Sequence, residues 1–170
     1  NARAYWVDAP GKATIRPVSL PSVGPGEVVV RVLYSGVSRG TESLVYQGRV
    51  PSSQHQTMRC PHQEGEFSFP VKYGYITVGV VEQGCGMEGQ HVFCLHPHQT
   101  HFVTSHQMVT PLPEGLDPGM AVLAANLETA VNGAWDANPQ AGETISVIGA
   151  GVVGALLWIP APVVAADAVA

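Results

Sequence analysis

Three glycines near the end of the chain constrain its fold more than any other feature. Gly149, Gly151 and Gly154 follow an apolar run and open a segment of helix-forming residues. This G-x-G-x-x-G spacing is typical of a βαβ unit, because the glycines permit a tight turn and close packing of helix against strand. The predicted elements are a buried strand over Glu143–Ile148, a helix beginning within Gly149–Trp158 and a second strand over Val163–Ala166.

The same motif predicts a dinucleotide cofactor. The second glycine lets the backbone approach a pyrophosphate, and the helix start, with Val152 and Val153, turns N–H groups toward the phosphates. Asp167 follows the second strand, where a carboxylate can accept hydrogen bonds from the ribose hydroxyls of NAD and repel the 2′-phosphate of NADP. We expect NAD. NADP stays an alternative, because Asp167 lies 18 residues after Gly149, whereas the usual interval is about 20.

The earlier part of the chain has a different sequence pattern. Short β-branched and aromatic runs alternate there with Gly and Pro turns, which predicts β-strands. The predicted strands are 2–7, 14–17, 27–35, 72–83, 90–95 and 100–104. The strand 27–35 is almost continuously apolar, so we expect both of its faces to be covered. From Pro118 the texture changes to Ala, Leu and Val, which predicts a helix over Pro118–Trp135 capped by Asp117. The predicted domains are therefore 1–117 and 118–170.

Composition narrows the partners. The net charge is −5 and only 8 of the 170 residues are Lys or Arg, with no basic run, which argues against nucleic acid or an anionic membrane as a partner. No apolar stretch reaches the roughly 18–20 residues of a membrane span. Three cysteines without CxxC spacing favour reduced thiols and a cytoplasmic location. We expect a small-molecule substrate, and a homodimer is a candidate oligomeric state.

The order of these segments resembles the medium-chain dehydrogenase/reductase superfamily. GPGEVVVRVLYSGVSRGTE looks like its early barrel strand and loop, VKYGYITVGVVEQG like its P-x-x-x-G-H-E-x-x-G strand, and LETAVNGAW like the helix before its Rossmann strand. The loop is also similar to that of a divergent branch that includes bacteriochlorophyllide dehydrogenase. The resemblance implies a mixed α/β chain, with a GroES-like partly open β-barrel followed by the start of a Rossmann domain. Complete members are longer, so we expect the chain to be part of a longer protein.

The resemblance also bears on zinc. The three positions that hold the catalytic zinc ligands in zinc-dependent members correspond here to Ser38, Tyr75 and Ala125, so zinc is not expected. A competing metal site would use the crowded side chains of CLHPHQTH, which are Cys94, His96, His98 and His101. A partly exposed histidine loop is the alternative for that segment.

The site residues follow from the same mapping. Ser38 and Tyr75 are the expected hydrogen-bond donors to a carbonyl oxygen, and a barrel-core role is the alternative for Tyr75. Thr41 and Glu42 resemble the Thr-Asp pair of the family's loop, which implies proton relay or ribose contact, and turn capping is the alternative. Two further candidates are Thr129 near the nicotinamide and His98 as a substrate contact.

These features together predict an NAD(P)-dependent oxidoreductase that transfers a hydride to or from an alcohol or carbonyl substrate. One alternative is a dinucleotide-binding protein without catalysis, acting as a redox sensor or a structural component. Another is an ordinary β domain with a chance glycine motif.

Overall fold

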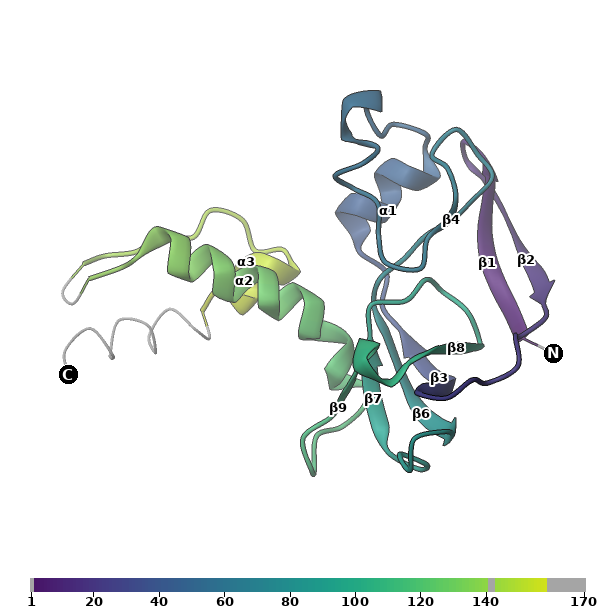
Figure 1. Cartoon of the computed structure of the whole chain (residues 1–170). Helices are drawn as coiled ribbons and strands as arrows, with labels where there is room; N and C mark the ends of the chain where they lie inside the picture. The colour runs from purple at the N-terminus through teal and green to yellow at the C-terminus, as the bar shows by residue number, and fades with distance from the viewer. Residues whose placement is uncertain (1, 141–142, 159–170) are drawn as a thin grey trace. The chain divides into compact units, whose positions relative to one another are not determined.

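The computed structural model describes residues 2–140 and 143–158, and the chain divides into two units, 1–122 and 123–170 (Figure 1). The first unit is built mainly of strands and the second of helices. The predicted strand Val163–Ala166 and Asp167 lie outside the described residues. None of the helices in the described part of the chain has the length and hydrophobicity that a bilayer crossing requires.

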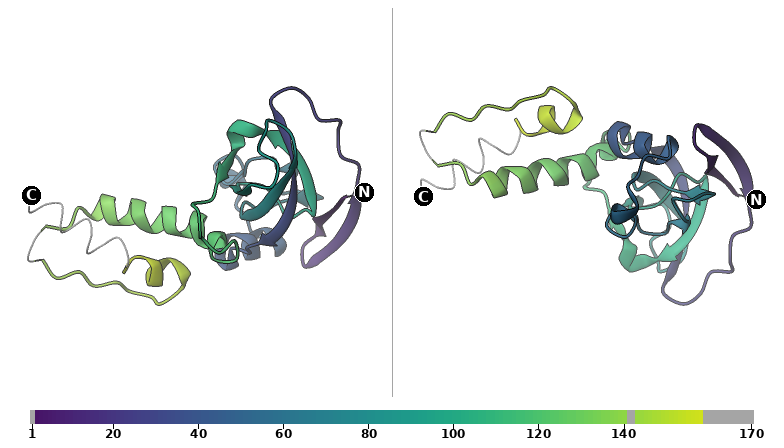
Figure 2. Two further views of the ribbon diagram at one scale, coloured as in Figure 1. Left: turned by 90° about the horizontal axis from the view of Figure 1, so that it is seen from below. Right: turned by 90° about the horizontal axis from the view of Figure 1, so that it is seen from above.

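Unit 1 contains two antiparallel sheets, whose strands curve around one another and do not form a flat layer (Figure 2). The larger has the order β8-β3-β6-β7-β9, with β3 (Glu27–Ser35), β6 (Thr77–Gln83), β7 (His91–Cys94), β8 (His101–Ser105) and β9 (Val109–Pro111). The smaller has the order β2-β1-β5-β4, with β1 (Ala2–Ala9), β2 (Lys12–Val18), β4 (Glu64–Gly65) and β5 (Val71–Lys72). The predicted mixed α/β chain with a curled β domain is confirmed.

Two apolar clusters form the core of this unit. The first joins the strands of the larger sheet and contains Val28, Val30, Val81, Val92, Cys94, Phe102 and Val109. The second lies between the smaller sheet and the helical connection, and contains Val7, Val45, Cys60, Phe67, Val71 and Tyr73.

The expectation that both faces of 27–35 are covered is wrong. Val28 and Val30 are fully buried, but the intervening positions are less so, and Arg31 is exposed. The Arg31 side chain donates a hydrogen bond of 2.7 Å to Glu82 on the neighbouring strand. An antiparallel sheet can leave one face in water, and charged pairs on that face allow it.

The predicted strand 72–83 is divided in two. β5 ends at Lys72 and β6 begins at Thr77, and between them Gly74 has a φ of 134°, a conformation that favours glycine. Within β6, Gly79 is required by a close approach, because a β-carbon there would lie 2.5 Å from Val30 Cγ1 and 2.6 Å from Arg31 O.

The connection between β3 and β4 contains elements that the sequence did not predict. α1 (Arg39–Tyr46) occupies the segment expected as a loop, and the short 3-10 helix η1 (Ser52–Gln54) follows it. Another 3-10 turn, η2 (His106–Met108), joins β8 to β9.

The predicted helix 118–135 begins later than expected. A 3-10 turn, η3 (Met120–Leu123), precedes α2 (Ala124–Ala137). Asp117 Oδ1 accepts the N–H of Gly119 at 2.9 Å, so Asp117 closes a turn ahead of the helix and does not cap α2 itself. The helix ends at Asn138, which has a left-handed φ of 45°.

The predicted buried strand 143–148 is not formed in the described residues. Ile145 is exposed and the Ile148 side chain is 99% exposed. A strand needs a neighbour to complete its hydrogen bonds, and no strand of the described chain pairs with this segment. The helix expected within 149–158 is present as α3 (Val152–Leu156).

Candidate functional site

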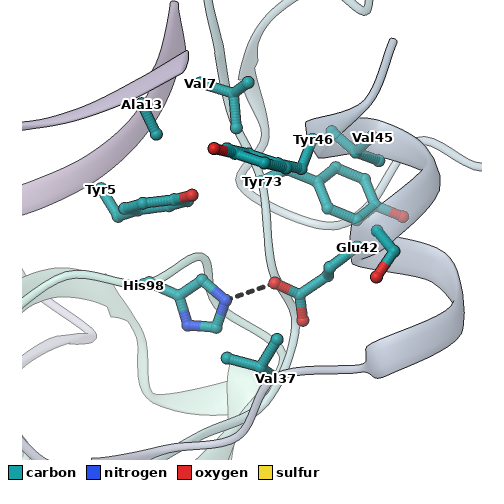
Figure 3. A pocket seen from close by; sticks show the side chains of 10 residues that line it. Tyr5, Val7, Ala13, Val37, Glu42, Val45, Tyr46, Tyr73 and His98 are labelled. Atoms are coloured by element: carbon teal, nitrogen blue, oxygen red, sulfur yellow. Dashed lines mark hydrogen bonds and ion pairs between the residues drawn. The ribbon is translucent and has the colours of Figure 1, made fainter. Parts of the chain in front are cut away.

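A pocket of about 560 Å³ opens in unit 1 beside α1 (Figure 3). Most of its wall is apolar or aromatic, and it is lined by Tyr5, Val7, Ala13, Val37, Glu42, Ser43, Val45, Tyr46, Tyr73 and His98. A cavity of this size, with few polar groups, suits a small organic molecule.

The polar side of the pocket is a pair of ionisable side chains. His98 Nε2 and Glu42 Oε2 lie 2.5 Å apart, and both side chains are nearly buried, at 13% and 11% exposed. Figure 3 shows the two side chains pointing toward one another. A charge-assisted hydrogen bond in such a poorly solvated place is stronger than one at the surface.

Glu42 is held by the first turn of α1. The helix begins after Ser38, whose N–H donates to Glu42 Oε1 at 2.7 Å, while the N–H of Glu42 donates to Ser38 O at 2.9 Å. The Ser38 N–H, which has no partner within the helix, is thus satisfied by the Glu42 carboxylate, one residue beyond the acceptor position of a capping box. Both oxygens of the Glu42 carboxylate therefore have partners.

His98 is positioned by the pairing of its loop with β1. Tyr5 N–H donates to His98 O at 3.0 Å, and Ala4 forms a bridge with Gln99. Gly74 packs against the imidazole, and a β-carbon there would lie 2.8 Å from Nε2. Residues far apart in the sequence thus fix both the backbone and the ring of His98.

The other imidazole nitrogen leads to the surface. His98 Nδ1 lies 2.5 Å from Ser35 Oγ, which in turn lies 3.1 Å from Ile76 O. The Ser35 hydroxyl has one proton for two acceptors. When the Ser35 hydroxyl donates to Ile76 O, His98 Nδ1 carries a proton and donates to the hydroxyl oxygen. When His98 Nδ1 carries no proton, the Ser35 hydroxyl donates to it instead. The imidazole can therefore gain or lose a proton without moving.

Three tyrosines surround the rest of the pocket. The Tyr46 hydroxyl donates to Gly11 O at 2.6 Å and the Tyr73 hydroxyl donates to Met58 O at 2.8 Å. Among the described residues the Tyr5 hydroxyl has no hydrogen-bond partner. Burial raises the pKa of Tyr5, and Tyr46 and Glu42 raise it further, so this hydroxyl stays protonated and available to a ligand.

The predicted site residues fall into two groups. Glu42 lines the pocket, and Ser38 holds it through its backbone N–H. Thr41 is half-buried and does not line the pocket. Tyr75 does not line it either; its ring packs edge-on against Tyr73, with centroids 6.1 Å apart. Thr129 Oγ1 donates to Ala125 O at 3.1 Å, one turn back in α2.

Sequence reasoning missed two residues of this network, Tyr5 and Ser35. Tyr5 belongs to no motif, whereas Ser35 lies in the family-like segment GPGEVVVRVLYSGVSRGTE without being singled out there, and each meets His98 only through the fold. His98 was a candidate by virtue of its crowded segment, which was the available signal.

The competing metal cluster is dispersed. His96 stacks on Phe102, with ring centroids 3.9 Å apart, while Cys94 belongs to the first core cluster and His98 pairs with Glu42. Within residues 2–140 and 143–158, no three His, Cys, Asp or Glu side chains converge as metal ligands would.

The glycine motif of unit 2 forms a turn before α3. Gly149 has a φ of 106°, and a β-carbon on Gly154 would lie 2.0 Å from Gly149 O, so both positions require glycine. At Gly151 nothing lies within 4 Å of where a β-carbon would be, so the space above it is open. Val152 and Val153 begin the helix that follows.

No family model matches the sequence, and no curated protein matches it either. Solved structures do. A quinone oxidoreductase from Thermus thermophilus has a TM-score of 0.66 at 25% identity, over 90% of this chain and 46% of its own. A zinc-dependent alcohol dehydrogenase from Streptococcus pneumonia has a TM-score of 0.74 at 17% identity, and the match covers 97% of this chain and 54% of that protein.

An alcohol dehydrogenase from Escherichia coli CFT073, crystallised with NADH, has a TM-score of 0.72 at 19% identity, over 92% of this chain and 51% of its own. The chain thus has the fold of the corresponding part of these dehydrogenases, and it spans about half of their length.

Proposed function

We propose that this chain is part of an NAD(P)-dependent oxidoreductase that transfers a hydride between a nicotinamide cofactor and an alcohol or carbonyl compound. The observation that carries the proposal is the Gly149–Gly154 turn in a chain with a dehydrogenase fold. Two of the similar structures were solved with NADH or NADPH, which supports the choice of cofactor.

The residues present fit such a cofactor. The turn conformation excludes side chains at Gly149 and Gly154, and the open space at Gly151 would admit a pyrophosphate. The N–H groups of Val152 and Val153 would bind its oxygens. We assign the ribose hydroxyls to Asp167, which favours NAD over NADP. The bound nicotinamide would accept or supply the hydride.

The remaining chemistry is the movement of a proton. Oxidation of an alcohol removes a hydride from the carbon, with its two electrons, and a proton from the hydroxyl oxygen, leaving a carbonyl. We propose that the proton passes to the Glu42–His98 pair and leaves through Ser35, which is exposed. In the reverse direction the same groups return it.

We propose that Tyr5 donates a hydrogen bond to the substrate oxygen, because its hydroxyl has no partner among the described residues and Tyr5 lines the pocket. Ser38, Thr41 and Tyr75 stay as proposed site residues, and Thr129 as a proposed cofactor contact. Ser38 and Tyr75 oxygens are poor zinc ligands beside thiolate or imidazole, and Ala125 offers no donor, so we propose a reaction without zinc.

The order Ser35–His98–Glu42 also resembles a hydrolase triad, but the geometry favours proton relay. Ser35 is not among the residues that line the pocket, and its hydroxyl is shared with Ile76 O. A nucleophile has to face its substrate.

Cofactor binding can be tested in the whole polypeptide to which this sequence belongs. We expect NADH fluorescence to change on titration, and Gly151→Val to abolish the change, because the side chain would fill the pyrophosphate space. Ala155→Ser, at an exposed position of α3, is the matched control. Unchanged NADH binding by Gly151→Val would remove the basis of the proposal.

Catalysis is tested separately. We expect Tyr5→Phe to lower turnover by about 10²-fold or more, with little change in NADH affinity, since a positioned donor contributes about that much. Tyr75 is also a proposed site residue but does not line the pocket, so Tyr75→Phe should lower turnover less than Tyr5→Phe does. A larger loss of turnover in Tyr75→Phe than in Tyr5→Phe would assign the hydrogen bond to the substrate oxygen to Tyr75. NADH binding by the unaltered protein without any hydride transfer would favour a redox sensor.

A further inference from the structure

We infer that the pocket of unit 1 binds a neutral aromatic molecule through a hydroxyl or carbonyl oxygen, so that the substrate is an aryl alcohol or aryl ketone. The reaction assigned to this molecule rests on the proposed function. Its binding rests on the pocket alone, which lies wholly within residues 5–98.

Two rings of the aromatic wall are fixed by hydrogen bonds from their hydroxyls to backbone carbonyls. Tyr46 is tied to the β1–β2 turn through Gly11 O, and Tyr73 is tied to Met58 O. Figure 3 shows the Tyr5 and Tyr46 rings, both nearly edge-on, on different sides of the pocket. Rings fixed in this way can contact a flat ligand by stacking or edge-to-face packing, which aromatic pairs prefer. Val37 and Val45 complete an apolar lining.

The charge of the pocket selects a neutral ligand. None of its ten lining residues is Lys or Arg, and its carboxylate, Glu42, would repel an anion. An ammonium group would have to compete for Glu42, whose oxygens already receive the Ser38 N–H and contact His98. Breaking that nearly buried pair is costly, whereas a neutral ligand leaves it intact.

The anchor for the ligand is the Tyr5 hydroxyl. Its raised pKa keeps it protonated, and it has no partner among the described residues, so it can donate to a hydroxyl or carbonyl oxygen. The other tyrosine hydroxyls of the pocket are engaged by backbone carbonyls.

Binding to the 170-residue chain, without cofactor, tests this inference. The probes are 1-phenylethanol and acetophenone, compared with 1-cyclohexylethanol, benzoate and benzylamine, with affinities from ¹H–¹⁵N chemical-shift titrations. We expect the two aryl probes to bind about three- to tenfold more tightly than 1-cyclohexylethanol, to bind more tightly than benzylamine, and to shift amides of the pocket. Benzoate should be the weakest.

Two variants locate the site. Tyr5→Phe should weaken both aryl probes by about three- to tenfold, the effect of one hydrogen bond, while Tyr34→Phe, at an exposed position away from the pocket, should have no effect. Val37→Trp should block binding, because Val37 lines the pocket and is 70% exposed, so the larger ring can be accommodated without disturbing the core.

Several results would overturn the inference. Equal binding of 1-cyclohexylethanol would show that aromaticity is not recognised, and unaltered binding in both Tyr5→Phe and Val37→Trp would place the ligand elsewhere. Tightest binding of benzylamine, lost in Glu42→Gln, would identify a cation site. A failure of hydride transfer with aryl binding intact would count against the proposed function and leave this pocket assignment standing.

Discussion

His96 is a buried base whose surroundings oppose its protonation. The residue is 4% exposed, and its ring stacks on Phe102. Burial lowers the pKa of His96 to about 3, and the nearby His62 and Lys72 lower it further, while the hydrogen bond to Pro97 O acts in the opposite direction. The folded protein therefore keeps His96 neutral where the unfolded chain would protonate it.

This linkage predicts a loss of stability in mild acid. Between the unfolded pKa of 6.5 and the folded value of about 3, the unfolded chain binds the extra proton, so the free energy of unfolding falls as pH falls. From pH 7 to pH 5 His96 should account for about 2 kcal/mol of that fall. Urea unfolding at both pH values should show a smaller fall for His96→Phe than for the unaltered chain.

His91→Gln is the control, because His91 is exposed. Its pH dependence should match that of the unaltered chain. An equal fall in His96→Phe would show that the proton is taken up elsewhere.

At the scale of elements, the pairing of β3 with β6 depends on one glycine. Gly79 lies opposite Val32, and a β-carbon there would overlap Val30 Cγ1 and Arg31 O. The neighbouring backbone cannot move away without disturbing the first core cluster. We expect Gly79→Ala to lower the free energy of unfolding by about 1–3 kcal/mol, the usual cost of overpacking, as measured by urea denaturation.

Gly40→Ala, in α1, provides a matched control in the same unit. Nothing lies within 4 Å of a β-carbon at Gly40, and alanine favours a helix, so stability should stay the same or rise slightly. A loss in the control as large as that in Gly79→Ala would contradict the steric explanation.

The strands of unit 1 could be predicted because their β-branched runs are bounded by Gly and Pro, and 27–35 was predicted to the residue. The helix α1 could not be predicted, because its polar residues and Gly40 are not typical of a helix. It is stabilised instead by the two hydrogen bonds between Ser38 and Glu42. The strand 143–148 was predicted from its apolar side chains, but a strand also needs a partner. The pattern of a short segment indicates which secondary structure its side chains favour. Whether a strand forms also depends on a neighbouring strand, which that pattern does not indicate.

The site was predictable only in part for the same reason. Glu42 was found through a motif in its own loop. Tyr5 and Ser35 come from different strands and meet His98 because β1 and β3 both approach the loop between β7 and β8. Such a juxtaposition has no signature in a single sequence.

In the molecule as a whole, both core clusters belong to unit 1, so this unit has a core of its own. Every residue of the two core clusters lies between Tyr5 and Val109, inside unit 1. The pocket and the Ser35–His98–Glu42 network lie in the same interval. The fold of this unit and its ligand pocket should therefore not depend on residues 123–170.

We predict that a chain of residues 1–122 folds cooperatively and keeps the pocket. Its thermal unfolding should be a single transition, and 1-phenylethanol should shift the same pocket amides as in the 170-residue chain, because both core clusters are complete. The comparison is a chain of residues 1–105, which lacks β9 and with it Val109, a buried member of the first cluster. Losing that side chain and the β7–β9 pairing should cost several kcal/mol, most of the stability of a small domain. Equal stability of the two chains, or an unfolded 1–122, would show that the core extends beyond these clusters.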